Sequence, residues 1–166
     1  MHRVLLIVMM AGIYLFAMGF EADRFMTKEV HNRLKFSLNR AAHDASLQVD
    51  AAALNDGRIQ FVRSDARVVF EAGLRYNLEL QSGAQLTPKE GTLLKGPVEI
   101  IYEDYVDDAT PGVAFPFSYV RNAEHIAQVL KGPAVIYRVR VPLPRTNRLS
   151  YDGYIYKTVI YEYPFY

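Results

Sequence analysis

The sequence predicts an α+β protein, in which one long N-terminal helix is followed by a small domain with an antiparallel β-sheet and short helices. An uncharged apolar run covers residues 4–20. Apolar residues then recur at steps of three and four to about residue 54, which is typical of an amphipathic helix. Three stretches rich in β-branched residues and Tyr follow between residues 98 and 163, as in strands. We therefore divide the chain into an N-terminal helix, 1–54, and a second domain, 55–166.

Composition excludes several classes of site. The 166 residues contain no Cys, so disulfides, thiolate zinc sites and cysteine nucleophiles are absent. The net charge is +1. Because Arg3 is the only charged residue among the first twenty, the rest of the chain has 18 basic and 18 acidic residues. Such a neutral chain argues against a nucleic-acid partner, since proteins that bind nucleic acids usually show a basic stripe.

The apolar run Val4–Phe20 has the composition of a membrane segment. Its 17 residues reach roughly 25 Å at about 1.5 Å per residue, just short of a hydrocarbon core of about 30 Å. His2 and Arg3 precede the run, and Glu21 and Asp23 follow it. This charge distribution favours an N-terminus inside the cell. We expect a single-pass anchor in the cell membrane, with residues 55–166 as an extracytoplasmic domain.

A cleaved leader is the alternative. Ala17 and Gly19 have the A-x-G spacing of a signal cleavage site, so cleavage after Gly19 is chemically possible. Tyr14, Phe16 and Phe20 instead favour an anchor held at the outer membrane interface. The sequence leaves open which of the two is correct.

Beyond the apolar run, the periodicity predicts one continuous helix from about Arg3 to about Leu54, ended by the turn Asn55-Asp56-Gly57. An apolar stripe with several small residues runs along the outer part, so another element packs closely on it. We assign these residues to helix packing in an assembly: Met26, Val30, Leu34, Leu38, Ala41 and Ala45. The packing partner is either the chain's own domain, expected for the C-terminal half, or a neighbouring subunit's helix.

The next elements are shorter. Arg58–Val62 is a candidate strand, and Ser64 is positioned to cap a helix from Asp65 to about Leu80. The residues expected on one face of that helix are Val69, Ala72, Tyr76 and Leu80. Residues 81–91 are expected to form a loop.

The sequence repeats itself once. Leu94-Lys95-Gly96-Pro97 and Leu130-Lys131-Gly132-Pro133 each open a β-rich run, and Pro at the start of a strand costs no ladder bond. These runs predict strands over 98–106 and 134–141, which we expect to be neighbours in one sheet. A third strand, 154–163, is apolar on both faces, so it lies inside a sandwich or against another subunit.

Two further expectations concern this region. If the first two strands are neighbours, Glu99 and Glu103 face Arg138 and Arg140 across the ladder. Asn122 is positioned to cap a short helix over residues 123–130.

Candidate catalytic and metal-binding residues are few. The four histidines, His2, His31, His43 and His125, do not have the spacing of metal ligands. An acidic cluster lies in the stretch EDYVDDATPG, formed by Glu103, Asp104, Asp107 and Asp108. Its spacing does not match a calcium-binding loop, so we expect a solvated turn, and weak Ca²⁺ binding remains open.

The chain also lacks a phosphate-binding Gly-rich loop, a G-x-S-x-G elbow and an H-E-x-x-H helix. We therefore expect no catalysis, no cofactor and no small-molecule substrate. The enzymatic alternative is a hydrolase that uses Glu103, Asp104 or Asp107, although no base–nucleophile arrangement accompanies them.

A family resemblance supports a structural role. Asp23-Arg24-Phe25, followed by Asn39-Arg40-Ala41-Ala42-His43-Asp44-Ala45, resembles TadE-like pseudopilins of the tight-adherence pilus machinery over about residues 4–50. Such proteins commonly carry a Glu near the start of the hydrophobic helix, whereas no acidic residue lies before or within the run here. The resemblance implies a membrane-anchored, pilin-like subunit of a surface filament or secretion apparatus. Its partners would be copies of itself or other pilin-like subunits.

The alternative function is an exported binding module with a cleaved leader. In that case, exposed tyrosines would stack on a protein or cell-wall ligand, for example Tyr151, Tyr154 or Tyr156.

Overall fold

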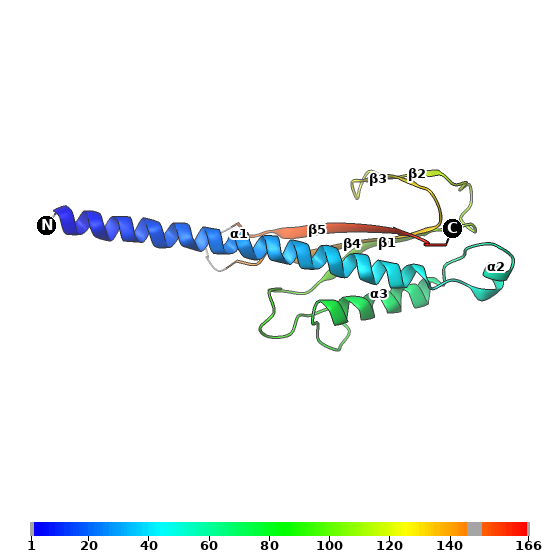
Figure 1. Ribbon diagram of the computed structural model, residues 1–166, viewed down its shortest axis with the longest axis horizontal. Coiled ribbons are helices and arrows are strands. Elements are labelled where there is room, and N and C mark those ends of the chain that lie inside the picture. Colours follow the sequence, from blue (N-terminus) through cyan, green and yellow to red (C-terminus); the bar gives the residue numbers. More distant parts are fainter. Residues whose placement is uncertain (1, 146–150, 166) are drawn as a thin grey trace.

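The computed structural model describes residues 2–145 and 151–165, and it confirms the α+β fold (Figure 1). The elements are α1 (His2–Ser46), α2 (Ala51–Asn55), α3 (Arg63–Asn77), β1 (Glu99–Val106), β2 (Phe117–Arg121), β3 (Ile126–Leu130), β4 (Ala134–Pro142) and β5 (Tyr154–Glu162). The N-terminal half of α1 projects from the domain, and its C-terminal half runs alongside the sheet and α3 (Figure 1).

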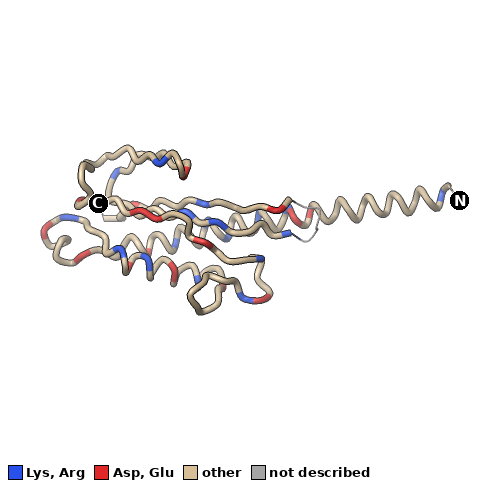
Figure 2. Tube along the Cα trace, turned by 180° about the vertical axis from the view of Figure 1, so that it is seen from behind, with Lys and Arg blue, Asp and Glu red and all other residues tan. Residues whose placement is uncertain are grey.

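The projecting half of α1 is the apolar run. Its side chains are exposed, and Figure 2 shows almost no charge along it until it approaches the domain. Among the described residues, α1 is the one helix long and apolar enough to cross a membrane. An N-terminal signal sequence would have the same length and composition.

The predicted single helix to Leu54 is wrong in one respect, because α1 ends at Ser46 and a separate short helix follows. The chain turns because Val49 forms a β-bridge with Phe61, and the Asp50 backbone N–H donates to Gln60 at 2.8 Å. The Asp50 carboxylate then accepts the Ala53 N–H at 2.8 Å and so caps α2. The candidate strand 58–62 is thus reduced to this single β-bridge at Phe61.

The helix α3 begins earlier than expected and buries a different face. Val62 is its N-cap residue and supplies no side-chain cap, while the Ser64 hydroxyl donates to Asp65. The buried face consists of Ala66, Phe70 and Leu74. The predicted face is not the buried one: Val69 is half-buried, and Ala72 and Tyr76 are exposed. Leu80 is buried, but it lies beyond the end of the helix. Two tertiary contacts, at Gly73 and Phe70, decide this orientation.

The first contact is the close approach of α3 to α1. A Cβ built at Gly73 would lie only 2.9 Å from the Ala41 Cβ, so the two helices meet with no room for a side chain. The second contact is the Phe70 ring, which stacks on the Tyr137 ring of β4 at 3.7 Å between centroids. Together they fix the face of α3 that points inward.

The three predicted strands form one antiparallel sheet in the order β1-β4-β5. The strands that follow the two repeated segments, β1 and β4, are therefore neighbours, as the sequence suggested. Residues Val135, Tyr137, Val139 and Val141 of the central strand β4 point into a core shared with α1 and α3. Ile136, on the other face of β4, is buried as well. Both faces are thus covered at the start of β4.

A β-hairpin covers this second face, and it replaces the helix predicted over residues 123–130. Strands β2 and β3 pair through a tight turn at Asn122–His125, where His125 has φ of 54°. Tyr119 and Leu130 of the hairpin are buried against Ile136. Figure 1 shows the hairpin on the opposite side of the sheet from α1 and α3. Burial of Tyr119 is a tertiary gain that outweighs the local helix signal.

Candidate assembly surface

The predicted packing stripe lies against the chain's own domain. Val30, Leu34, Leu38, Ala41 and Ala45 belong to the main core, together with residues of α3, β4 and β5, while Met26 is half-buried. This result agrees with the expectation for the C-terminal half of the helix. The assignment of the stripe to packing between subunits stays a prediction, because the contacts seen here join it to the chain's own α3, β4 and β5.

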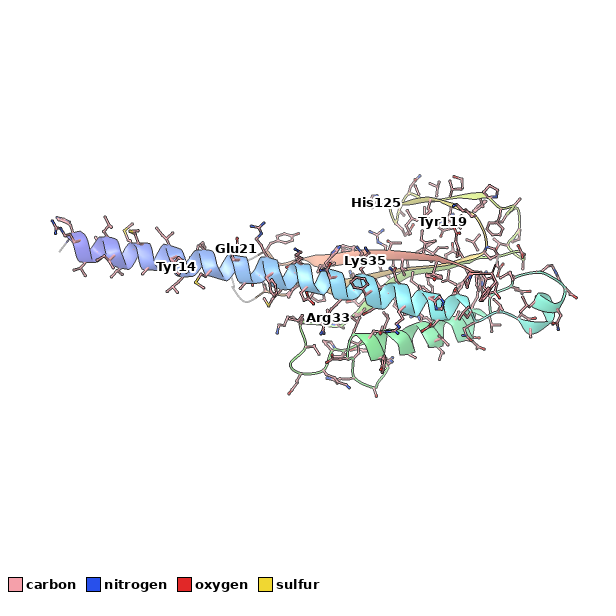
Figure 3. All side chains as sticks on the ribbon, in the orientation of Figure 1. Tyr14, Glu21, Arg33, Lys35, Tyr119 and His125 are labelled. Carbon is pink, nitrogen blue, oxygen red and sulfur yellow. The ribbon has the colours of Figure 1, made fainter. Side chains whose placement is uncertain are left out.

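The opposite face of α1 carries two aromatic side chains that sequence reasoning did not single out. Phe25 is 70% exposed and Phe36 is 68% exposed. They are eleven residues apart, which is three helical turns plus roughly 20°, so both lie on one line along the helix. The exposed Tyr14 precedes Phe25 by the same interval, and Figure 3 shows it on the projecting part of α1. The eleven-residue spacing is the sequence signal that could have identified this line.

Charged groups flank the aromatic line. A shallow hollow of about 450 Å³ borders Phe36 and is lined by Glu29, Arg33 and Arg40 of α1. Arg33 reaches Glu79, which follows α3, at 3.9 Å between charged atoms. Figure 3 shows Arg33 and Lys35 on the part of α1 that lies beside the domain. The exposed face therefore combines apolar rings with charges of both signs.

The tyrosines proposed as ligand contacts lie on or next to β5. Tyr154 and Tyr156 are half-exposed, and each has one ring face covered by an arginine of β4. Arg140 lies 5.0 Å from the Tyr154 ring centroid, and Arg138 lies 5.5 Å from that of Tyr156. Tyr151 is 80% exposed. Stacking on a ligand is thus least hindered at Tyr151.

The expected acid–base pairing across the sheet is half right. Glu99 and Arg140 form an ion pair at 2.6 Å, in register on β1 and β4. Glu103, however, pairs with Arg67 of α3. A register irregularity between residues 100 and 102 turns Glu103 to the side of the sheet that faces α3, opposite Tyr137.

The expectation of a solvated acidic turn is wrong for Asp107, which is buried, while Asp108 is exposed as expected; both carboxylates bind backbone N–H groups of the fold. Asp107 is only 3% exposed and accepts hydrogen bonds from the Phe61 N–H (3.1 Å), the Ala109 N–H (3.2 Å) and the Thr110 hydroxyl (2.9 Å). Asp108 accepts the Ile59 N–H at 2.7 Å. These bonds tie the loop after β1 to the segment before α3.

The third carboxylate, Asp104, accepts hydrogen bonds from the hydroxyls of Tyr119 (2.7 Å) and Tyr102 (3.1 Å), and its ion pair with Arg121 is 3.3 Å long. In the part of the chain that the structure describes, no group of three or more His, Asp or Glu side chains could hold a metal ion. The acidic cluster thus acts as a set of hydrogen-bond acceptors within the domain.

Two tyrosine pairs in the domain, one buried and one partly buried, contain hydroxyls with a raised pKa. Tyr105 and Tyr137 meet at 2.7 Å between hydroxyl oxygens, and Tyr102 and Tyr119 meet at 2.6 Å. Burial, followed by the hydrogen bond within each pair, raises the pKa of Tyr137 and of Tyr119 well above the ordinary value. Both hydroxyls therefore keep their protons at a pH where an exposed tyrosine ionises, and that of Tyr119 donates to Asp104.

The acidic residues of the stretch EDYVDDATPG are used within the fold. The groups that sequence reasoning offered as catalytic are engaged with backbone N–H groups, hydroxyls and arginines of the fold. The long apolar helix followed by a small β domain is consistent with a pilin-like architecture. No family model, curated protein or solved structure matches this chain.

Proposed function

We propose that this protein is a membrane-anchored, pilin-like structural subunit without catalytic activity. It assembles with copies of itself, or with other pilin-like subunits, through the exposed face of α1. The observation that carries this proposal is the line Tyr14, Phe25 and Phe36, which runs without a break from the apolar segment to the helix beside the domain. The domain leaves this line uncovered.

The size of the aromatic rings supports an intermolecular contact. Removing one Phe side chain from water is worth about 1.5–3 kcal/mol, so two rings covered by a neighbouring helix would contribute about 3–6 kcal/mol. Single exposed apolar residues are common on protein surfaces. Two on one line, continuous with a membrane segment, are better explained by a packing partner, because both can meet the same neighbouring helix.

A cysteine cross-linking experiment tests the proposal. Because the chain has no Cys, a disulfide between copies of Asn32→Cys can form only at the exposed face of α1, between Phe25 and Phe36. We expect oxidised membranes to yield cross-linked dimers of this variant. The matched control is Val68→Cys, on the equally exposed outer side of α3, for which little cross-linking is expected.

A second variant ties the contact to the aromatic rings. Adding Phe25→Glu and Phe36→Glu to the Asn32→Cys protein should abolish its dimer. Equal dimer yields from Asn32→Cys and Val68→Cys would contradict assembly through this face, as would dimers that survive the two Glu substitutions.

The exported binding module remains the second candidate, and the exposed Tyr151 favours it. Intact mass of the protein from its native fraction separates the two. A mass near 18.9 kDa supports a retained anchor. A mass lacking about the first nineteen residues supports a cleaved leader and a soluble binding domain.

A further inference from the structure

A cleft lies at the base of the domain, where α1 leaves it toward the apolar run. The cleft has a volume of about 600 Å³. One wall is α1, including Phe20, Arg24 and Lys28, and the other wall is formed by Leu143, Pro144 and Tyr151. Lys157 of β5 contacts the α1 wall, since its Nζ lies 2.9 Å from the Nε2 of His31, which also lines the cleft.

The position of this cleft follows from the anchor. Phe20 is the last residue of the apolar run, and Lys28 lies eight residues further on, about 12 Å along the helix. The polar layer of a bilayer extends several Å beyond its hydrocarbon core on each side, because the full thickness is about 40–45 Å and the core is about 30 Å. If the apolar run spans the membrane, the α1 wall of the cleft therefore starts at the edge of the hydrocarbon core, crosses the headgroup layer near Arg24, about 6 Å beyond Phe20, and leaves it before Lys28, whose long side chain can reach back to the phosphates.

The chemistry of the lining matches that layer. Tyr151 is an aromatic residue of the kind enriched at membrane interfaces, and Phe20 and Pro144 add apolar surface. Arg24 and Lys28 supply cations that attract the phosphates of lipid headgroups. The lining also contains the acidic Asp23, which is buried, and Arg24 has an exposed partner in Glu21 at 3.3 Å. An exposed pair of this kind is weak and exchanges readily with another anion.

We infer that this cleft binds a phospholipid headgroup of the outer leaflet, so that the base of the domain rests on the membrane surface. Lys28 and Arg24 face the phosphate, and Tyr151 enters the interface. This inference rests on the proposed retained anchor. It adds a second membrane contact, which fixes the domain's orientation relative to the bilayer.

The absence of Trp from the chain allows a direct test. The full chain is reconstituted in vesicles of phosphatidylcholine and phosphatidylglycerol that contain brominated lipids, which quench nearby tryptophan fluorescence. Three single variants are compared: Tyr151→Trp at the cleft, Tyr14→Trp inside the apolar run, and Tyr76→Trp on the exposed side of α3. Tyr76 is 83% exposed and provides the solvent reference.

The expected result is strong loss of fluorescence for Tyr14→Trp, little loss for Tyr76→Trp, and clear loss for Tyr151→Trp when the bromine lies near the headgroup. If Tyr151→Trp behaves like Tyr76→Trp while Tyr14→Trp is quenched, the inference is overturned and the anchor stands. If Tyr14→Trp is not quenched, the anchor itself fails, and the inference fails with it.

A charge reversal tests the headgroup contact separately. In the Tyr151→Trp background, Lys28→Glu should reduce quenching because it places a negative charge against the phosphates. The control is Lys131→Glu, an exposed lysine just before β4 and so at the opposite end of that strand from the cleft. Unchanged quenching in the Lys28→Glu protein would overturn the assignment of a headgroup site.

Discussion

Replacing Asp107 with Ala should destabilise the domain far more than replacing its neighbour Asp108. The Asp107 carboxylate is buried and holds three donors, of which the Phe61 N–H is itself buried. Asp108 is exposed and holds one donor, the Ile59 N–H. Both carboxylates connect the loop after β1 to the segment before α3. The difference in stability between the two variants therefore reports on burial and on the number of hydrogen bonds.

The magnitude follows from the donors left without partners. A buried N–H without an acceptor costs about 1–3 kcal/mol, and the two half-buried donors, which can reach water, cost about 0.5–1.5 kcal/mol each. Part of this cost is recovered, because the carboxylate no longer has to be desolvated. We expect a net loss of about 2–4 kcal/mol for Asp107→Ala and about 1 kcal/mol for Asp108→Ala. At about 2–4 °C per kcal/mol, the melting temperature of Asp107→Ala should fall by about 5–15 °C.

Thermal unfolding of the full chain in detergent micelles measures these losses. The apolar half of α1 keeps its helix in a micelle, so the near-ultraviolet circular dichroism of the buried tyrosines is the better signal. Tyr105 and Tyr137 lie in the core beside Phe70 and report on its packing. Equal losses for the two variants would refute the reasoning, because the buried carboxylate would then contribute no more than the exposed one.

Three further substitutions test the core and its hydrogen bonds. Leu34→Asp places a charge in a fully buried position, so the near-ultraviolet signal of the domain should be lost along with any assembly; a folded variant would contradict the packing of α1. Burial raises the pKa of Tyr119 and Tyr137, so the folded state keeps protons that the unfolded state releases above about pH 10. Stability should therefore be constant below that pH and fall above it by about 1.4 kcal/mol per pH unit for each tyrosine. In urea unfolding between about pH 9 and 11, Tyr119→Phe should reduce this slope, and an unaltered slope would contradict the assignment. Gly73→Leu would push α3 away from Ala41 and lower stability by about 1–3 kcal/mol or more, as measured by thermal unfolding; an unchanged melting temperature would show that the helices are not in close contact.

The sequence predicted those elements whose signal is local. The long helix was evident from its apolar run and its steps of three and four, and the strands β1, β4 and β5 from β-branched runs opened by Gly-Pro or bounded by turns. The hairpin was missed because Asn122 carries a helix-capping signal. The competing signal is nonlocal: Tyr119 is buried against Ile136 only when residues 117–130 fold back on the sheet.

The inward face of α3 shows the same limit. The set Val69, Ala72 and Tyr76 and the set Ala66, Phe70 and Leu74 both have helical spacing. Spacing cannot choose between two such faces. The choice depends on Gly73 meeting α1 and on a ring stacking against β4, and both contacts join residues far apart in the sequence. Likewise, the sequence predicted that the chain's own domain packs on the C-terminal half of the apolar stripe, but it could not tell that α3, β4 and β5 are the elements that cover it.

The two faces of α1 allow folding and assembly to be separated within three residues. Leu34 points into the core and Phe36 points to solvent on the opposite side. Since α1 is unbroken from His2 to Ser46, the angle of Phe36 around the helix is fixed relative to the apolar run. A neighbouring helix that packs along the aromatic line within the apolar run would therefore meet Phe36 as well. A charge at Phe36 should then reduce association while the melting temperature stays unchanged, whereas a charge at Leu34 should reduce both. If the charge at Phe36 also unfolded the domain, this face would belong to the fold, and the proposed contact between subunits would have to lie elsewhere.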